Sequence, residues 1–507
     1  MKKPQTARMM IMVVVVMLTV GIVWTVGLFV QPLTEKKSAE GRSGSVILTD
    51  RGFLPSEITI SQGSEVIFST IRKIPFWPAS DLHPSHSLYP EFDPKAPIAP
   101  TKDWRFTFTK PGTWKYHDHL NPQYEGVIKA LNNKGKEQSF DCNSFSETNS
   151  TEKRVCWSQK VDEVLRKKGM TEALKTVEQL NQKEPEFNSV CHDVMHKIGW
   201  HLYRDIARGK KIILTGETTM CGYGLYHGFT ELLATTPDRV RQARAFCRSV
   251  GQNLSRAFPD AELQCYHGLG HGSVIIDNQA MWGNEEAMTA DAKKLCTDVS
   301  ETSNERFRCA TGVFDAISIG YYNHDYHIQM DLKDPYKLCR TQTVAEYKKA
   351  CYISMNTAVM MLFEYDMTRA VPFVAAIENT DIAVSTMQNL VLSRVELHLH
   401  ASPEQEARVL SFYQNGSIAY CHTLPAYLVT PCIKSVANAL SLKEGDEPGY
   451  RDAIVYCRSQ GLVDTERREC FSSVINQVSS SFGKAKARSA CDDLTEAERE
   501  YACSGLL

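Results

Sequence analysis

The 507-residue sequence has little excess of charge of either sign. It contains 57 Lys and Arg against 59 Asp and Glu, which gives a formal net charge of −2. A protein that binds nucleic acid needs a basic surface for the phosphates. This balance therefore gives no support for nucleic acid as a partner.

Several chemical motifs are also absent. We find no glycine loop of the kind that cradles phosphate and no Gly-x-Ser-x-Gly nucleophile elbow. The segment "CHDVMH" differs from the Cys-x-x-Cys-His sequence that attaches haem, so we expect no covalent haem. These absences leave the catalytic residues unknown, and whether the chain is an enzyme stays open.

Charge is missing from Met9 to Val30, a run of 22 residues. Roughly 20 apolar residues are enough for a helix to cross a bilayer, and the basic residues Lys2, Lys3 and Arg8 favour the cytoplasmic side. No Ala-x-Ala-like cleavage site follows this run. We therefore expect residues 1–30 to form an uncleaved transmembrane signal anchor. The membrane would then be a partner, and the bulk of the chain would be extracytoplasmic, in the periplasm or at the cell surface.

Cysteine is absent from the first 141 residues, and all sixteen cysteines follow. An even number of cysteines in an exported chain indicates disulfides. Most neighbouring cysteines are separated by 11 to 18 positions, which suits a link between the two helices of a hairpin. The sequence does not fix their connectivity, but pairing neighbours predicts the following bonds: Cys142–Cys156, Cys191–Cys221, Cys247–Cys265, Cys296–Cys309, Cys339–Cys351, Cys421–Cys432, Cys457–Cys470 and Cys491–Cys503.

The spacing of apolar residues divides the rest of the chain. Residues 31–44 are polar and predict a linker. Residues 45–131 contain short runs such as "SEVIFST" and "RFTFTK", which are typical of strands in a small sandwich. Residues 132–150 predict a second linker. Residues 151–507 have apolar residues three and four apart, and predict a cysteine-rich domain of helical hairpins, a solenoid or a toroid, with a subdomain break near residues 400–415 as an option.

The β region, residues 45–131, resembles the cupredoxin family through "GFLPSEITISQGSEVIFST" followed by "PGTWKYHDHLNPQYEGVI". The resemblance implies an all-β Greek-key sandwich of the plastocyanin or azurin type. In the family's blue-copper loop, Tyr-x-Cys-x-x-His-x-x-Met-x-Gly, the ligand positions correspond here to Asp118, Asn121 and Tyr124. All three ligands are replaced, and with no cysteine before Cys142 a thiolate–copper centre is excluded in this domain. The helical region resembles no particular family.

Four histidines of the β region nevertheless suit a metal. His117 and His119 are two residues apart, so on an extended strand both project to one face. Their segment is similar to the "YHSH" segment of multicopper oxidases, whose His-x-His pairs bind copper through imidazole. The upstream ligand region of the family has a counterpart in "WPASDLHPSHSLYP", with His83 and His86. The resemblance implies a non-blue Cu(II) site. The alternative is a shell without metal, whose histidines are only hydrogen-bonded.

A second group of histidines lies in the expected helices, in "CHDVMHKIGWHLY", "CGYGLYHGFTE" and "CYHGLGHG". Residues four apart share a face of a helix, and helical bundles hold metals with such pairs of His and carboxylate. Glycines crowd these segments, which favours close helix packing or access for a ligand. The alternative is a set of polar core histidines. The spacing predicts a second metal site, for Zn, Fe or Cu, with these ligands: His192, His196, His227, Glu231, His267 and His271.

Three functions remain open from the sequence. The first is a membrane-anchored, extracytoplasmic copper-binding protein that acts in metal handling or redox chemistry, with a redox or metal-delivery partner. The second is a metal-dependent enzyme with its active site in the helical domain, where Glu231 or Asp193 would serve as acid or base. The third is a disulfide-stapled binding scaffold without catalysis.

Overall fold

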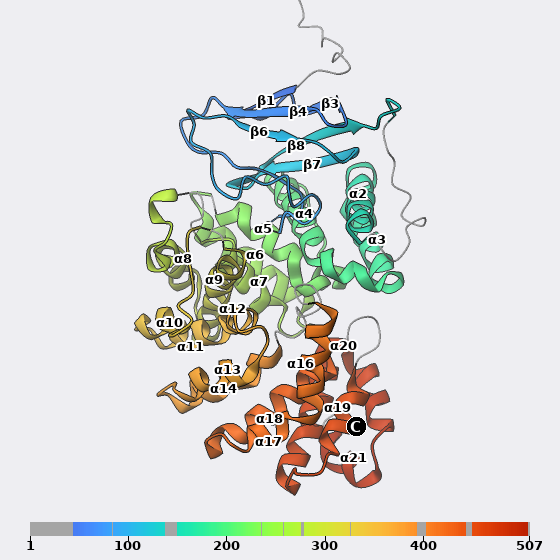
Figure 1. The fold of residues 1–507 in the computed structure, drawn as a ribbon, viewed down its shortest axis with the longest axis vertical. Coiled ribbons are helices and arrows are strands. Elements are labelled where there is room, and N and C mark those ends of the chain that lie inside the picture. Colours follow the sequence, from blue (N-terminus) through green and yellow to red (C-terminus); the bar gives the residue numbers. More distant parts are fainter. Residues whose placement is uncertain are drawn as a thin grey trace, which may run out of the picture.

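The strands of the protein gather at one end, and helices form the remainder (Figure 1). The structure is a computed structural model. It describes residues 44–83, 85–136, 150–234, 236–256, 258–274, 278–324, 326–392, 402–442 and 449–504.

The strands follow the short runs of β-branched and aromatic residues, which fit a pleated and half-buried surface. Alternate residues of β1, β4 and β7 point into the core, as the period of two requires. In the described residues the strands are β1 (Gly44–Thr49), β2 (Gly52–Leu54), β3 (Glu57–Ser61), β4 (Glu65–Thr70), β5 (Pro78–Ser80), β6 (Trp104–Thr107), β7 (Gly112–Asp118) and β8 (Asn121–Leu131).

These strands form two four-stranded sheets, in the orders β2-β1-β4-β6 and β3-β8-β7-β5. Side chains of both sheets fill the space between them. Phe68 of β4 and Tyr116 of β7 meet edge to face, with ring centroids 5.4 Å apart, and both are fully buried. Contacts of this kind hold the second sheet, and with it the end of β7, in a fixed position.

The expected fold class is wrong in its account of the strands. Strand β1 runs parallel to β4, and β3 runs parallel to β8, so both sheets are mixed and small, and they do not form a clear all-β sandwich. The protein as a whole is mostly helical. Strand direction cannot be read from alternating hydrophobicity, because parallel and antiparallel strands have the same period.

Side-chain caps mark the first turn of several helices. Helix α9, for example, starts with a capping box in which Thr302 and Glu305 each accept a backbone N–H of the other, at 3.2 Å. In the described residues the α-helices are α2 (Ser150–Lys168), α3 (Met170–Lys183), α4 (Asn188–Ala207), α5 (Gly224–Ala234), α6 (Arg239–Leu254), α7 (Ala261–His271), α8 (Glu285–Val299), α9 (Ser303–Asn323), α10 (Lys337–Thr341), α11 (Ala345–Ser354), α12 (Asn356–Leu362), α13 (Met367–Ala375), α14 (Thr380–Leu390), α16 (Pro403–Asn415), α17 (Ser417–Cys421), α18 (Ala426–Ser441), α19 (Tyr450–Cys457), α20 (Asp464–Asp492) and α21 (Glu496–Ala502).

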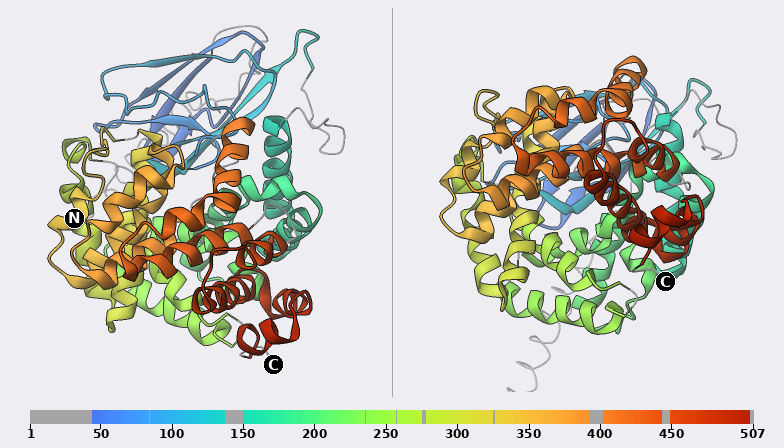
Figure 2. Two further views of the ribbon diagram at one scale, coloured as in Figure 1. Left: turned by 60° about the horizontal axis from the view of Figure 1, so that its bottom comes forward. Right: turned by 90° about the horizontal axis from the view of Figure 1, so that it is seen from below.

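Disulfides join helices that follow one another in the chain. Five of the seven bonds among the described residues link an α-helix to the next α-helix, as Cys247 of α6 is linked to Cys265 of α7. Seen from below, the helices follow one another around the view in chain order (Figure 2). Cys142 lies outside the described residues. The disulfides among the described residues are Cys191–Cys221, Cys247–Cys265, Cys296–Cys309, Cys339–Cys351, Cys421–Cys432, Cys457–Cys470 and Cys491–Cys503.

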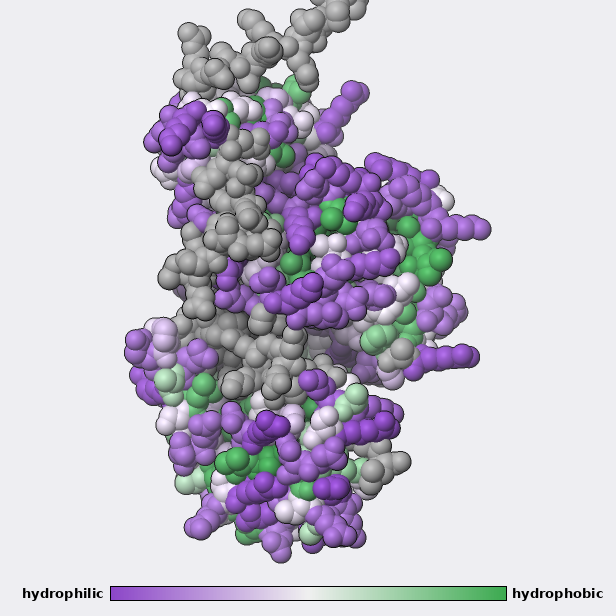
Figure 3. Space-filling view, turned by 90° about the vertical axis from the view of Figure 1, so that its right-hand side faces the viewer, coloured by the Kyte–Doolittle hydropathy of each residue, from purple (hydrophilic) through white to green (hydrophobic). Residues whose placement is uncertain are grey.

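The length and composition of the helices do not support the expected membrane anchor. Among the described residues, no helix combines the length and the apolar composition that a membrane span needs. The long helix α20, with 29 residues, carries acidic and basic residues near both ends. The face that carries α2 and α3 is mostly hydrophilic, with small separate hydrophobic patches (Figure 3). Residues 9–30 themselves lie outside the described residues, and the membrane-anchored location has no support in the structure.

A buried ion cluster joins the sheets to the helices. Lys197 of α4 forms ion pairs with Asp81, which follows β5, and with Asp162 of α2. Lys115 of β7 pairs with the same Asp162 carboxylate. Burial alone would lower the pKa of Lys197, but the two carboxylates outweigh it and hold that pKa above its usual value. The lysine is therefore charged, and it holds three elements together away from water.

We predict that Lys197→Met strongly destabilises the fold. The change leaves buried carboxylates without their main partner, and breaking a buried ion pair in this way costs about 3–5 kcal/mol of unfolding free energy. Denaturation by urea would measure this loss. Lys167→Met is the matched control, because Lys167 pairs with Glu163 on the exposed face of α2 and surface pairs contribute little. Equal effects of the two substitutions would contradict the role of the buried cluster.

Candidate metal centres

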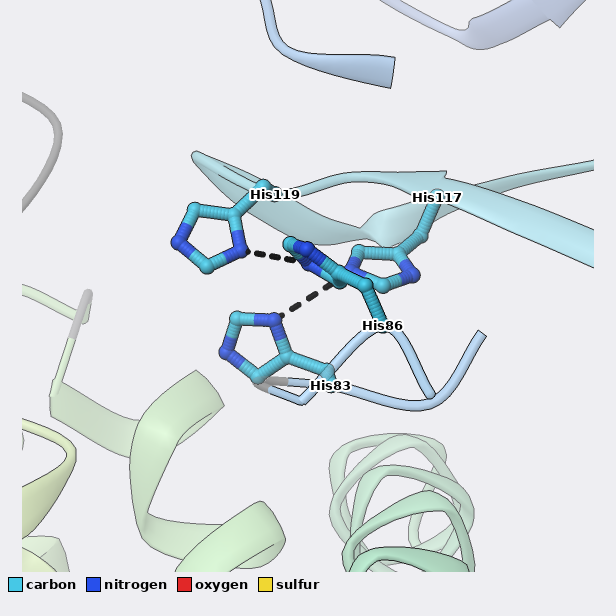
Figure 4. Close-up of side chains that lie close together, drawn as sticks. All are labelled: His83, His86, His117 and His119. Carbon is cyan, nitrogen blue, oxygen red and sulfur yellow. Dashed lines mark hydrogen bonds between the residues drawn. The ribbon is translucent and has the colours of Figure 1, made fainter. Parts of the chain in front are cut away.

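Four histidines from two separated stretches meet at one end of the second sheet (Figure 4). His83 and His86 lie in the loop that follows β5, His117 lies on β7, and His119 lies in the turn before β8. Pairing of β5 with β7 places Ala79 opposite His117, which brings the loop beside the end of β7. One ring nitrogen from each histidine lies within 4.8 Å of the other three. We call these four residues the sheet cluster.

The inward nitrogens of the sheet cluster are close to one another. Nδ1 of His119 lies 2.9 Å from Nε2 of His86, and Nδ1 of His83 lies 3.2 Å from Nε2 of His117. All four residues are buried, with exposed fractions of 5% or less. Without a cation, four rings at these distances must share protons in hydrogen bonds; with a cation, each offers a lone pair.

Carboxylates hold the outward nitrogens of two rings. Nδ1–H of His86 donates to Asp93 at 2.7 Å, and Nδ1–H of His117 donates to Asp81 at 3.3 Å. Since an ionised carboxylate only accepts, these bonds place the proton on Nδ1 and leave the Nε2 lone pair directed at the cluster. Asp81 also pairs with Lys197, so the buried ion cluster orients a residue of the site.

The pKa shifts favour neutral imidazoles. Burial, with the neighbouring histidines, lowers the pKa of His83 and of His119 well below its usual value. Burial opposes ionisation of Asp81 and Asp93 as well, but Lys197 and His117 near the first, and His86 and Lys95 near the second, hold both carboxyl pKa values below their usual range. Neutral rings with ionised carboxylates behind them are the state that binds a metal ion.

The helical part of the chain covers this cluster. Tyr326, between α9 and α10, has its hydroxyl 2.7 Å from Nε2 of His119. The ring of Trp77 packs against His119, with centroids 4.4 Å apart, and its Nε1–H donates to Asp93. Tyr326 has a left-handed backbone, with φ of 56°, a conformation that costs energy in a non-glycine residue. Both nitrogens of the His119 ring are therefore held in place.

A second set of histidines converges among the helices. His192 and His196 lie one turn apart on α4, and His227 lies on α5. One ring nitrogen of each lies within 4.8 Å of the other two. We call these three residues the helical cluster. Nδ1–H of His192 donates to the carbonyl of Cys221 at 2.9 Å, so its Nε2 is free to face Nε2 of His196, at 3.1 Å.

Glu231 of α5 flanks the helical cluster. Its Oε1 lies 2.9 Å from Nδ1 of His196, and its Oε2 accepts from Nε1–H of Trp200 at 2.8 Å. Burial alone would lower the pKa of His196, but Glu231 and Asp193 raise it. The same pair holds the pKa of Glu231 below its usual range, although burial opposes this. A proton on Nδ1 of His196, shared with Glu231, leaves the Nε2 lone pair of that ring directed at His192.

The buried ring nitrogens of His227 indicate whether a metal ion fits the helical cluster. Within the described part of the chain, neither of its ring nitrogens has a hydrogen-bond partner, and both are buried. A buried polar atom without a partner costs about 1–3 kcal/mol. Burial, with four neighbouring histidines, lowers its pKa well below the usual value, so protonation does not resolve the cost. A metal ion bound between His227 and the two histidines of α4 would resolve it for one nitrogen.

Glycines allow these helices to approach backbone to backbone. A Cβ at Gly199 of α4 would collide with the carbonyl oxygen of Leu225, and one at Gly228 of α5 would collide with that of His196. At Gly268 of α7 a Cβ would lie 2.8 Å from Cδ2 of His227. Close helix approach thus explains why glycines crowd the histidine segments.

His267 and His271 lie beside the helical cluster, farther from its centre than its three members. Their rings are each 5.2 Å from that of His227, and both face Asp315 of α9, at 3.9 Å and 3.5 Å. The side chain of Asp315 is 34% exposed, and those of His267 and His271 are 18% and 12% exposed. This side of the helical cluster is therefore more open to solvent than the sheet cluster.

Sequence reasoning missed the residues that surround the histidines. Asp81 and Asp93 lie close to His83 and His86 in the chain, so local composition offered a signal for them. Tyr326 lies 207 positions beyond His119, and Asp315 lies on a helix with no metal-ligand spacing. Only the folded chain brings these two to the clusters.

No family model and no curated protein matches the chain. A copper-containing nitrite reductase from Thermus scotoductus SA-01 is among the solved structures with a match, at 22% sequence identity and a TM-score of 0.16. The match covers 20% of this chain and 25% of that protein.

We predict that Tyr326→Phe weakens metal binding at the sheet cluster. Removing a group that orients a metal-ligating histidine typically lowers affinity by about 10–100-fold, and the hydroxyl of Tyr326 is the group that holds Nε2 of His119. Titration of Cu(II) against a competing chelator would measure the change. Tyr124→Phe, which removes a hydroxyl bonded to the carbonyl of Asp50, should leave the affinity unchanged.

We also predict that the metal-free protein loses stability as the pH falls through about 6.5, the unfolded-state pKa of histidine. His83, His119 and His227 have strongly lowered pKa values in the fold, and the pKa of His192 falls to about 3. The folded state therefore binds fewer protons than the unfolded state, and each ring contributes up to about 1.4 kcal/mol per pH unit. Urea denaturation between pH 7.5 and 6 measures the slope, which should be shallower in His83→Ala.

Proposed function

We propose that the protein binds copper in the sheet cluster and a second metal ion in the helical cluster, and that it acts in metal handling or redox chemistry. The sheet region would then be a cupredoxin-like domain that binds copper through imidazole alone. The observation that carries the proposal is the convergence of four buried ring nitrogens within 4.8 Å.

The ligand chemistry supports copper over the alkaline-earth ions. Imidazole suits Cu, Zn, Fe and Ni, whereas Mg and Ca prefer carboxylate and carbonyl oxygens. The sheet cluster offers only imidazoles as converging ligands, with Asp81 and Asp93 behind the rings. Among the divalent ions of the first transition row, Cu(II) has the highest affinity for a given nitrogen site.

A second candidate function is a metal-dependent enzyme centred on the helical cluster. Three histidines leave a tetrahedral ion one open position, which is the arrangement of catalytic zinc sites. Solvent approaches on the side of Asp315, whose side chain is 34% exposed. Burial raises the pKa of Asp193, and a carboxyl group shifted in this direction suits proton transfer near neutral pH.

We predict that two double variants each remove the metal ion of one cluster and leave the ion of the other cluster bound. His117→Ala with His119→Ala should remove the ion of the sheet cluster, because it takes away both ligands from the β7 end. His192→Ala with His196→Ala should remove the ion of the helical cluster. Elemental analysis and electron paramagnetic resonance of the full chain, with disulfides intact, would measure both losses.

The control is His422→Ala, since Nε2 of His422 bonds to Glu466 at 3.1 Å, remote in the chain from either cluster. It should bind the same amount of metal as the wild type. A wild-type chain without metal, after exposure to Cu(II) and Zn(II), would overturn the proposal and leave a binding scaffold.

A further inference from the structure

The two clusters differ in what they can exchange with their surroundings. All four rings of the sheet cluster are buried, so a substrate in solution has no direct approach to an ion held among them. Electrons can still reach such an ion, because electron transfer needs no direct contact with the metal. The helical cluster has fewer ligands and a more exposed side, as a site of substrate chemistry requires.

Trp200 lies between the clusters. Helix α4 carries His192, His196 and Trp200 at intervals of four residues, so the three share one face. The indole of Trp200 is 5.9 Å from the ring of His83 and 6.3 Å from that of His117, between centroids. It is 1% exposed, so water is excluded from this contact.

Glu231 continues the contact to the helical cluster. Nε1–H of Trp200 donates to one oxygen of Glu231 at 2.8 Å, and the other oxygen lies 2.9 Å from His196. A continuous series of contacts therefore runs from the rings of His83 and His117, through Trp200 and Glu231, to His196. Electron exchange through such contacts is much faster than across a gap of the same length.

The other side of the sheet cluster leads to the surface. The ring of Trp77 lies 4.4 Å from that of His119, and Trp282 lies 6.0 Å from Trp77. Trp282 is half-buried and packs against the exposed His327, at 5.3 Å. An outer-sphere electron donor can thus approach the sheet cluster through aromatic rings without reaching the ion.

We propose that the sheet cluster relays single electrons to the helical cluster through Trp200 and Glu231. This inference rests on the proposed function, since both clusters must hold a redox-active ion. With copper in both, Cu(I) of the sheet cluster loses one electron and becomes Cu(II), while Cu(II) of the helical cluster gains it and becomes Cu(I). An outer-sphere one-electron donor supplies the electron, and no bond to a protein atom is broken.

The test measures electron exchange between the clusters in the full chain. The two double variants described above, each with one copper ion, provide the reference spectrum of each cluster by electron paramagnetic resonance. The wild type is then loaded with Cu(II), mixed with less than one equivalent of hexaammineruthenium(II), and frozen after increasing times. We expect the sheet-cluster signal to fall first and then to recover while the helical-cluster signal falls.

Trp200→Phe and Trp200→Leu should slow this recovery several-fold, the second more than the first, when the rates are compared in samples that hold one copper ion in each cluster. Trp157→Phe is the matched control, because it replaces another buried indole whose ring packs against Phe187, and it should exchange as fast as the wild type. If Trp200→Leu fails to fold or loses an ion, the Trp200→Phe rate decides.

Two results would overturn the relay. Recovery as fast in both Trp200 variants as in the wild type, with both ions bound, would show that Trp200 is only a packing residue. Absence of one reference spectrum in the wild type would instead refute the metal centre itself, before any Trp200 variant is compared.

Discussion

The ion pair between Lys197 and Asp81 is the constraint on which the arrangement of both clusters depends. Asp81 follows β5 and accepts a hydrogen bond from His117, and Lys197 is the neighbour of His196 on α4. A single buried charge pair thus fixes the loop of the sheet cluster against the helix of the helical cluster. Leaving either charge alone in the interior is very unfavourable, so this pair favours the observed docking of the sheets on α4.

Most of the correct predictions came from local sequence patterns. The contacts between distant segments could not be predicted in this way. His83 with His86, and His192 with His196, are recognisable because metal ligands recur at short spacings. The neighbouring cysteines, such as Cys296 and Cys309, indicated which helices are joined. The parallel direction of β3 and β8 could not be read from the sequence. The uncharged run from Met9 to Val30 predicted a membrane anchor that the described residues do not support.

The surroundings of the clusters were beyond the sequence for a physical reason. A ligand must have a particular chemistry, whereas a residue that orients it needs only one suitable polar atom at the right place. Tyr326 supplies a hydroxyl, and Trp200 supplies an indole N–H, and many other tyrosines and tryptophans of the chain offer the same groups. The roles of Tyr326 and Trp200 depend on their positions in the fold. Both residues contact side chains that lie far from them in the sequence.

The order of the disulfides has a consequence for biosynthesis. Each of the disulfides among the described residues joins a cysteine to the next cysteine in the chain, at most 30 positions away. A chain that enters an oxidising compartment from its N-terminus exposes its thiols in the same order. In such a chain each thiol would meet its native partner before any later competitor had emerged, and oxidation in that order would produce the observed bonds without reshuffling.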